Sequence, residues 1–314
     1  MISTDLQRVV QTALAEDFGM AGDLTSQMTV PQGARGTLDV TSREDGALSG
    51  CKAVDAVFAA IDATVTVSWS KRAGDKISSN EIVAVITGPA HPILTGERTA
   101  LNLLGHLTGI ASRTSSFVNL VDGTGVRVVD TRKTTPGLRA LEKRAVLDGG
   151  GGNHRFGLFD AILVKDNHIA LGGGLRPVLD RIAAHRSHLV RVEVEVDTLE
   201  QLNQLLTYDA QRLESGAPRV VDAVLLDNMS LAKVRAAVEQ VRAHLAPLLV
   251  EVSGSVTEES IRAFAATEID TISVGTLTHS VRCHDFGLDN PSTTLTTPEF
   301  HSEDRNRLEH YYVD

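Results

Sequence analysis

The chain has 314 residues, of which 42% are hydrophobic, enough to build one large barrel or two modest domains. Its formal net charge of −10 disfavours nucleic-acid binding through bulk positive charge. The two cysteines, Cys51 and Cys283, have no metal-ligand spacing and no disulfide framework, which suits a reducing compartment. Because no signal peptide or bilayer-spanning apolar run is recognisable, we expect a cytoplasmic protein that binds neither nucleic acid nor membrane.

The first hundred residues predict a small helix-and-sheet domain. Residues 4–16 repeat apolar side chains at helical spacing and predict an amphipathic helix, whereas residues 21–26 are typical of a turn. Short β-like runs separated by turns fill residues 36–87. The run KRAGDKISSNEIVAVITG resembles the hairpin of biotinyl and lipoyl carrier domains, but it has no Met-Lys-Met-like tip. A β-rich packing domain is therefore favoured over a carrier.

A long helix is predicted over residues 96–121, with four large aliphatic side chains on one stripe: Leu101, Leu104, Leu107 and Ile110. Arg98 is expected in its first turn, where a cation opposes the helix macrodipole by about 0.3–1 kcal/mol. Spacing alone favours a compensating ion pair with Glu97 or another acid. The alternative is a bound anion.

After Gly125 the pattern changes to alternating strands and helices. The predicted strands are 126–130, 161–165, 190–196, 221–227, 248–252 and 270–274, each a near-continuous apolar run of the buried parallel type. The predicted helices are 136–147, opened by Pro136, then 175–185, 199–206, 231–245 and 258–266. Thr198 with Gln201 predicts a capping box, and Thr257 is expected to cap the last helix. Repeated βαβ units predict a doubly wound sheet or a (β/α) barrel.

Positive side chains follow the first two of these strands. Arg132 and Lys133 come directly after one strand, and Lys165 ends the next. Between them a run of four glycines, which lets backbone approach closely, leads to His154 and Arg155. Because chemistry in a (β/α) barrel collects at the carboxyl ends of the strands, this pattern predicts a site for an anion with several carboxylates or phosphates.

Acidic side chains end two further strands. Alternation in VEVEV places Glu193 and Glu195 on one face, and Asp227 ends VLLD. A single buried acid is often a structural ion pair, but several acids and cations at strand ends favour a functional site. Glu195 and Asp227 suit sugar hydroxyls or Mg²⁺, which prefers oxygen ligands. Backbone N–H groups near the later strand ends suit a phosphate: Ser253, Gly254, Ser255 and Gly275.

The segment TRKTTPGLRALEKRAVLDGGGGNHRFGLFDAILVKDNHI resembles the central signature of the quinolinate phosphoribosyltransferase family. Further matches are AEDFGMAGDLTS, GERTALNLLGHLTGIA, VEVEVDTLEQL, VLLDNMS and DTISVGTLTHS, so the resemblance covers about residues 13–288. It implies the α/β fold of the type II phosphoribosyltransferases, an N-terminal α/β sandwich with an incomplete (β/α) barrel. We place the sandwich at residues 1–110 and the barrel at 111–280, and expect 281–314 to pack back on the sandwich.

The resemblance also implies a reaction. Quinolinate and phosphoribosyl pyrophosphate would give nicotinate mononucleotide, pyrophosphate and carbon dioxide with Mg²⁺, in the making of NAD. Quinolinate would be bound by Arg132, His154, Arg155 and Lys165, and by Arg98 from the second subunit of a homodimer. Lys133 would bind the pyrophosphate, and Glu195 and Asp227 the ribose hydroxyls, directly or through Mg²⁺. The 5′-phosphate would lie against Ser253, Gly254, Ser255 and Gly275. The catalytic set expected is Lys165, Glu195 and Asp227.

Three other interpretations remain open. A related type II enzyme, such as nicotinate phosphoribosyltransferase or the molybdenum-transport-associated homologue, shares the implied fold, but the TRKT, NHR and LLDNM motifs favour the quinolinate family. A barrel aldolase would use Lys165 as its Schiff-base residue. A non-enzymatic binding module is the third, and the density of charge at the strand ends disfavours it. The chain departs from the family at Ser255, where a second glycine is frequent.

Overall fold

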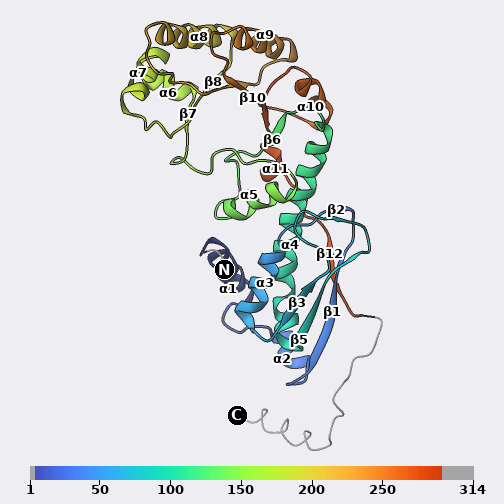
Figure 1. Ribbon diagram of the computed structural model, residues 1–314. Coiled ribbons are helices and arrows are strands. Elements are labelled where there is room, and N and C mark those ends of the chain that lie inside the picture. The colour runs from blue at the N-terminus through green and yellow to red at the C-terminus, as the bar shows by residue number, and fades with distance from the viewer. Residues whose placement is uncertain (1–3, 292–314) are drawn as a thin grey trace, which may run out of the picture.

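The computed structural model describes residues 4–291 and contains two domains that share one long helix (Figure 1). This helix, α4 (Ala90–Leu120), begins beside the sheet of the first domain, and its far end contacts helices of the second. The mixed α/β class is confirmed, with an antiparallel sheet in the first domain and a parallel sheet in the second.

The first domain packs helices against a four-stranded antiparallel sheet. The strand order is β12-β1-β5-β3, formed by Phe286–Asp289, Arg35–Ser42, Ile82–Pro89 and Thr66–Trp69. The helices are α1 (Thr4–Phe18), α2 (Leu24–Thr29) and α3 (Cys51–Ile61), and a small ribbon joins β2 (Gly46–Ala47) to β4 (Lys76–Ile77). The sequence prediction missed α2 and α3. In α3, Val54, Val57 and Phe58 are buried at helical spacing between the β-like runs.

Helix α4 begins earlier than predicted, at Ala90, and does not start at Gly96. Gly96 lies inside the helix, where α4 packs closely on α3. A Cβ at this position would come within 3.0 Å of the Phe58 and Ile61 side chains of α3, so only glycine fits. Arg98 is therefore beyond the first two turns, and the predicted macrodipole penalty does not apply to it. The predicted apolar stripe is confirmed, since all four of its members are buried.

The second domain is a barrel of six parallel strands with one open side. The order is β6-β11-β10-β9-β8-β7, formed by Arg127–Val129, Thr271–Ser273, Leu249–Ser253, Ala223–Asp227, Val192–Val196 and Ile162–Val164. The last strand pairs with the first, whereas no ladder joins β6 to β7 among the described residues. A single parallel bridge from Val129 to Gly152 lies at that opening. The predicted incomplete barrel is confirmed.

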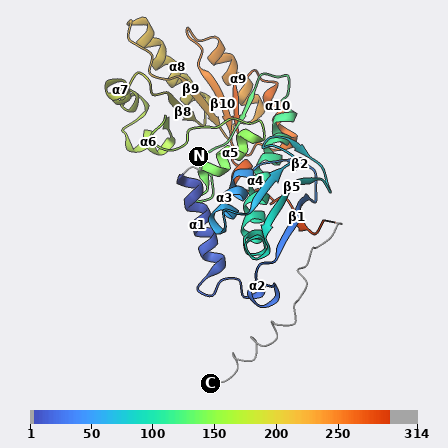
Figure 2. The ribbon, with the colours of Figure 1, turned by 60° about the horizontal axis from the view of Figure 1, so that its bottom comes forward.

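Helices connect the strands on the outside of the barrel (Figures 1 and 2). They are α5 (Arg139–Asp148), α6 (Asp166–Leu171), α7 (Leu175–His185), α8 (Leu199–Glu214), α9 (Leu231–Arg242), α10 (Glu258–Ala265) and α11 (Thr276–His279). The capping box of Thr198 with Gln201 and the Thr257 cap are both confirmed. Pro136 does not open α5, because Gly137 follows it with a positive φ of 84° and the helix begins only at Arg139. Helix α6 was not predicted, and α8 runs beyond its predicted end.

The chain returns to the first domain after the barrel. Strand β12 pairs antiparallel with β1, with Val40 opposite Leu288. Helix α4 continues past residue 110, the predicted boundary between the domains. Of the predicted C-terminal segment 281–314, residues 292–314 lie outside the described part of the chain.

Candidate anion-binding site

Two arginines on neighbouring loops of the barrel domain each have an unsatisfied guanidinium nitrogen, and Nη1 of Arg155 donates to the Ala161 carbonyl just before β7 at 3.2 Å. Arg132 follows β6, and Arg155 follows the glycine run. The Nε atom of each is buried and has no hydrogen-bond partner within the described residues. Burial and then the positive charge of Arg132 lower the pKa of Arg155. Two neighbouring cations with spare donors are an arrangement that an anion stabilises.

Lys165 lies at the carboxyl end of β7 and forms an ion pair with Glu195 at the end of β8. The Lys165 side chain is 43% exposed, whereas that of Glu195 is only 11% exposed. As VEVEV predicts, Glu193 and Glu195 share the inner face of β8, between buried valines. A ligand carboxylate would therefore compete with Glu195 for Lys165.

The turn after β10 holds the residues predicted to bind phosphate. Asp227 and Ser253 are opposite one another in the β9–β10 register, and Asn228 donates to the Asp227 carboxylate at 2.7 Å. Gly254 has a positive φ of 94°, and a Cβ there would run into the Asn228 side chain. Ser255 also has a positive φ, 49°, which is unusual for a residue with a side chain. These residues lie at the same end of the barrel as Lys165.

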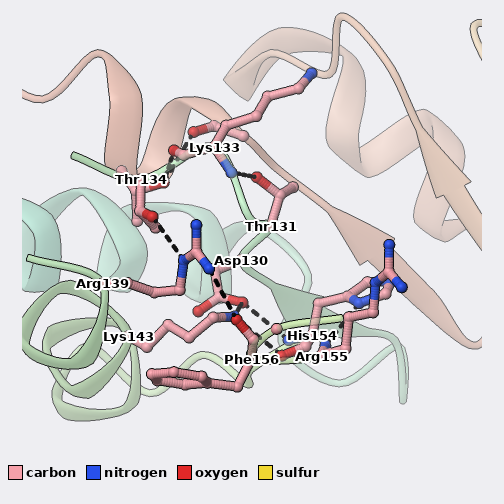
Figure 3. Close-up of polar contacts among 12 residues, drawn as sticks. Asp130, Thr131, Lys133, Thr134, Arg139, Lys143, His154, Arg155 and Phe156 are labelled. Atoms are coloured by element: carbon pink, nitrogen blue, oxygen red, sulfur yellow. Dashed lines mark hydrogen bonds and ion pairs between the residues drawn. The ribbon is translucent and has the colours of Figure 1, made fainter. Parts of the chain in front are cut away.

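Lys133 and Gly275 lie together on the other side of the mouth. A Cβ on Gly275 would approach the Lys133 side chain to 3.2 Å. Lys133 is exposed, and Figure 3 shows its side chain directed away from His154 and Arg155. The Lys133 carbonyl accepts a hydrogen bond from the Thr278 hydroxyl at 2.7 Å, which fixes the loop after β6 to α11.

The His154 ring points into the barrel, and both of its nitrogens contact other groups of the protein. The Arg155 backbone N–H donates to Nδ1 at 2.7 Å, and Nε2 lies 3.1 Å from Glu193 and 3.6 Å from Glu251. Burial opposes the charged ring, but the hydrogen bond to Glu193 and the negative charges of Glu251 and Glu193 outweigh it and raise the pKa of His154. Unlike the two arginines, His154 offers no free ring nitrogen to a ligand at the mouth.

Glu251 of β10 is almost completely buried beside His154, and its Oε1 atom has no hydrogen-bond partner in the described part of the chain. Burial and the charge of Glu193 raise the pKa of Glu251 to about 7. Ligand atoms of His154, Glu193 and Glu251 lie within 4.8 Å of one another, close enough to hold a metal ion or to share a proton. Sequence reasoning missed Glu251, although an acid inside the apolar run LLVEVS was its signal.

A cavity of about 350 Å³ adjoins this cluster and opens toward the amino-terminal ends of the strands. First residues of the strands line it, with the cluster as its polar floor: Arg127, Ile162, Val192, Ala223, Leu249 and Thr271. Of the residues predicted from the sequence, His154 and Arg155 line this cavity as well, whereas Lys165, Glu195, Asp227 and Ser253 lie at or near the carboxyl ends of their strands.

Arg98 does not join the mouth within this chain. Its neighbours Gly96 and Thr99 face the first domain, where Gly96 packs on α3 and Thr99 donates to Asp17 of α1. Arg98 itself is exposed and has no hydrogen bond or ion pair within residues 4–291. The ion pair with Glu97, favoured on spacing, was therefore wrong.

The fold is an incomplete (β/α) barrel whose strand ends carry clustered cations and acids. No helix in the described part of the chain is long and apolar enough to cross a membrane. A family model described as the C-terminal domain of quinolinate phosphoribosyl transferase matches residues 110–289, and the model of the N-terminal domain matches residues 23–108. The chain belongs to the quinolinate phosphoribosyltransferase family.

Individual relatives agree with this assignment. A probable nicotinate-nucleotide pyrophosphorylase (carboxylating) of Bacillus subtilis is 37% identical over 90% of this chain and 93% of its own length. The enzyme of that name from Mycobacterium leprae is 38% identical over 89% and 95%. A solved nicotinate-nucleotide pyrophosphorylase from Francisella tularensis superposes with a TM-score of 0.82 at 35% identity, covering 91% of this chain and 95% of that one.

Proposed function

We propose that this protein is an enzyme of de novo NAD biosynthesis. It transfers the phosphoribosyl group of phosphoribosyl pyrophosphate to quinolinate, with decarboxylation, and yields nicotinate mononucleotide, pyrophosphate and carbon dioxide. The observation that carries the proposal is the pair of arginines on neighbouring loops, Arg132 and Arg155, each with an Nε that lacks a partner among the described residues, in a barrel of this family. They suit the adjacent carboxylates of quinolinate.

Each end of the reacting pair has residues of matching chemistry. Arg132, Arg155 and Lys165 would hold the dicarboxylate, with His154 behind them. Glu195 and Asp227 would accept hydrogen bonds from the ribose hydroxyls. Lys133 would bind the pyrophosphate, and the 5′-phosphate would take backbone N–H groups from the two turns that contain Ser253, Gly254, Ser255 and Gly275.

Glu195 and Asp227 also fit Mg²⁺, because both present carboxylate oxygens at neighbouring strand ends and, among the described residues, Glu195 is paired only with Lys165. The ion would supply positive charge to the pyrophosphate. We propose it as the cofactor on this donor chemistry.

The reaction needs charges at both ends of the breaking bond. The pyridine nitrogen attacks C1 of the sugar as pyrophosphate leaves, so positive charge develops on the ribose and negative charge on the leaving group. Glu195 and Asp227 would stabilise the first, and Lys133 the second. Ribosylation makes the pyridine nitrogen cationic, and this charge stabilises the electron pair left on the neighbouring ring carbon as its carboxylate departs as carbon dioxide. A proton from solvent then binds to that carbon.

We further propose a cytoplasmic homodimer in which Arg98 completes the site of the partner subunit. Arg98 is an exposed cation without a partner among residues 4–291. A cation of this kind is available to a carboxylate brought by another subunit. The two free cysteines suit a reducing cytoplasm.

The direct test is product formation. The purified protein should produce nicotinate mononucleotide from quinolinate and phosphoribosyl pyrophosphate, and should use nicotinate at least about 100-fold less well in kcat/KM, because nicotinate lacks one of the two carboxylates. Equal use of nicotinate would instead favour the related nicotinate enzyme. Product release can be followed by chromatography.

A Schiff-base aldolase is the second candidate, because Lys165 lies at a strand end in a barrel. Its ion pair with Glu195 stabilises the charged ammonium, whereas a Schiff-base lysine needs a neutral amine. Borohydride should trap no substrate adduct on Lys165. A trapped adduct would support the aldolase.

A further inference from the structure

Helix α5 carries three charged side chains that the proposed reaction does not use. Glu142 and Lys143 are adjacent and buried, and Arg139 lies one turn before them. A buried charge costs several kcal/mol unless it is paired and hydrogen-bonded, so these side chains need partners. Their partners lie in the loop that carries Arg132 and in the segment that carries Arg155. The one exception is His106 of α4.

Lys143 holds the segment that leads to Arg155. Its Nζ atom forms an ion pair with Asp130 at 2.5 Å and donates to the His154 carbonyl at 3.0 Å (Figure 3). Asp130 in turn accepts the His154 backbone N–H at 2.9 Å. The ion pair therefore grips His154 at both its backbone N–H and its carbonyl, and Asp130 directly precedes the loop of Arg132.

Arg139 and Glu142 hold the same two loops from other directions. Arg139 donates to the Thr134 hydroxyl at 3.0 Å and to the Phe156 carbonyl at 3.3 Å, and so joins one loop to the other. One oxygen of Glu142 accepts the Thr135 N–H at 3.1 Å, and the other binds His106 of α4 at 2.8 Å. Each loop is thus fixed at more than one point.

We infer that Asp130, Arg139, Glu142 and Lys143 are positioning residues, which hold the loop of Arg132 against the loop of Arg155 so that the two arginines can bind two adjacent carboxylates. The arginines repel one another, and an unrestrained loop would separate them. The network supplies this restraint before a ligand arrives, so binding does not need to order the loops. The inference rests on the proposed function for the identity of the ligand, quinolinate.

The test removes both charges of the central ion pair, because removing one would leave the other buried and unpaired. In the double variant Asp130→Asn/Lys143→Met, the amide oxygen introduced at position 130 can still accept the His154 N–H, but the Lys143 contacts are lost. The matched control is Asp209→Asn/Arg219→Met, which removes a pair with an equally buried aspartate: Asp209 of α8 and Arg219, beyond the end of that helix, are joined at 3.0 Å. The control should lose stability without changing substrate affinity.

We expect the double variant to fold and to raise the KM for quinolinate by about tenfold or more, the loss of a charge-assisted hydrogen bond. The KM for phosphoribosyl pyrophosphate should change less than about twofold. Hydrogen exchange of the 150–158 segment should accelerate. The pair would have only a structural role if the folded double variant kept the wild-type KM for quinolinate, or if this KM rose equally in the control.

A binding measurement separates this inference from the proposed function. Phthalate has two adjacent carboxylates and no ring nitrogen, and benzoate has one carboxylate. The wild type should bind phthalate at least about tenfold more tightly than benzoate, and the double variant should lose most of that preference. This result would stand even if the wild type made no nicotinate mononucleotide. A preference that the double variant retains in full would overturn the inference.

Discussion

At the scale of single residues, the mouth of the barrel combines cations that lack partners with cations that have them. Arg132 and Arg155 keep unsatisfied nitrogens within the described chain, whereas Lys165 is paired with Glu195. A ligand that approaches the arginines gains hydrogen bonds without breaking any, but one that approaches Lys165 must replace Glu195. The arginines should therefore govern affinity for the dicarboxylate. Lys165 should exchange its ion pair with Glu195 for one with the ligand when the site is filled.

Arg132→Ala and Lys165→Ala should each lower kcat/KM by about 100-fold or more, because each removes a charge aimed at the bound anion. Neither side chain is fully buried, so the midpoint of thermal unfolding should change little. Steady-state kinetics with a melting curve for each variant test this. Near wild-type turnover would remove that residue from the site.

Glu251 should make stability depend on pH. Its pKa of about 7 in the folded protein lies above the ordinary value of 4.5, so the folded state binds the proton more tightly than the unfolded state. The contribution of Glu251 to stability is then fully present at low pH and is lost as pH rises from about 4.5 to 7, by a few kcal/mol at most.

Glu251→Gln removes this titration. Urea unfolding at pH 5 and pH 8 should show the variant gaining stability relative to the wild type as pH rises. A constant difference between the two proteins would mean that Glu251 is ionised across this range. Glu268→Gln, outside the barrel interior, is the control for the loss of one carboxylate.

At the scale of elements, the turn between β10 and α10 combines a required glycine with a strained serine. Gly254 cannot be replaced without displacing Asn228, whereas Ser255 has a left-handed backbone that only its side chain makes unfavourable. Ser255 stands where a second glycine is frequent in the family. The serine therefore costs stability, but its backbone N–H remains in place.

Ser255→Gly should stabilise the protein by up to about 1 kcal/mol, since relief of strain exceeds the added flexibility of the unfolded chain. Chemical denaturation measures the change. Ser260→Gly, in the first turn of the adjacent helix, removes the hydroxyl that accepts the Thr257 N–H at 2.9 Å and should destabilise. A loss of stability in Ser255→Gly would show that the serine side chain contributes more than its backbone costs.

The strands of the barrel could be predicted from the sequence because each is a buried apolar run of characteristic length. Helix α3 was missed because it is short and lies between β-like runs, although Val54, Val57 and Phe58 have helical spacing. At the site, strand-end residues were readable, because parallel strands bring their carboxyl ends together. The inward turn of His154 was not, because Glu193 and Glu251 are distant in sequence and meet it only in the folded barrel.

At the scale of the whole molecule, the position of Arg98 predicts a dependence on assembly. A protein with Arg98→Ala in one subunit and Lys165→Ala in the other should keep one intact site if Arg98 acts across a dimer. Mixing the two inactive variants should then restore up to about a quarter to a half of wild-type activity, according to how the chains pair. Absence of recovery in verified heterodimers would place Arg98 outside the site.

The shared helix α4 has a mechanical consequence. Its 31 residues span about 45 Å without a break, and β12 provides a second covalent return between the same two bodies. A continuous helix and a second chain connection resist a swing of one half against the other, so we expect entry of substrates to depend on loop movement. Calorimetry should accordingly record a single cooperative transition, with neither half melting ahead of the other.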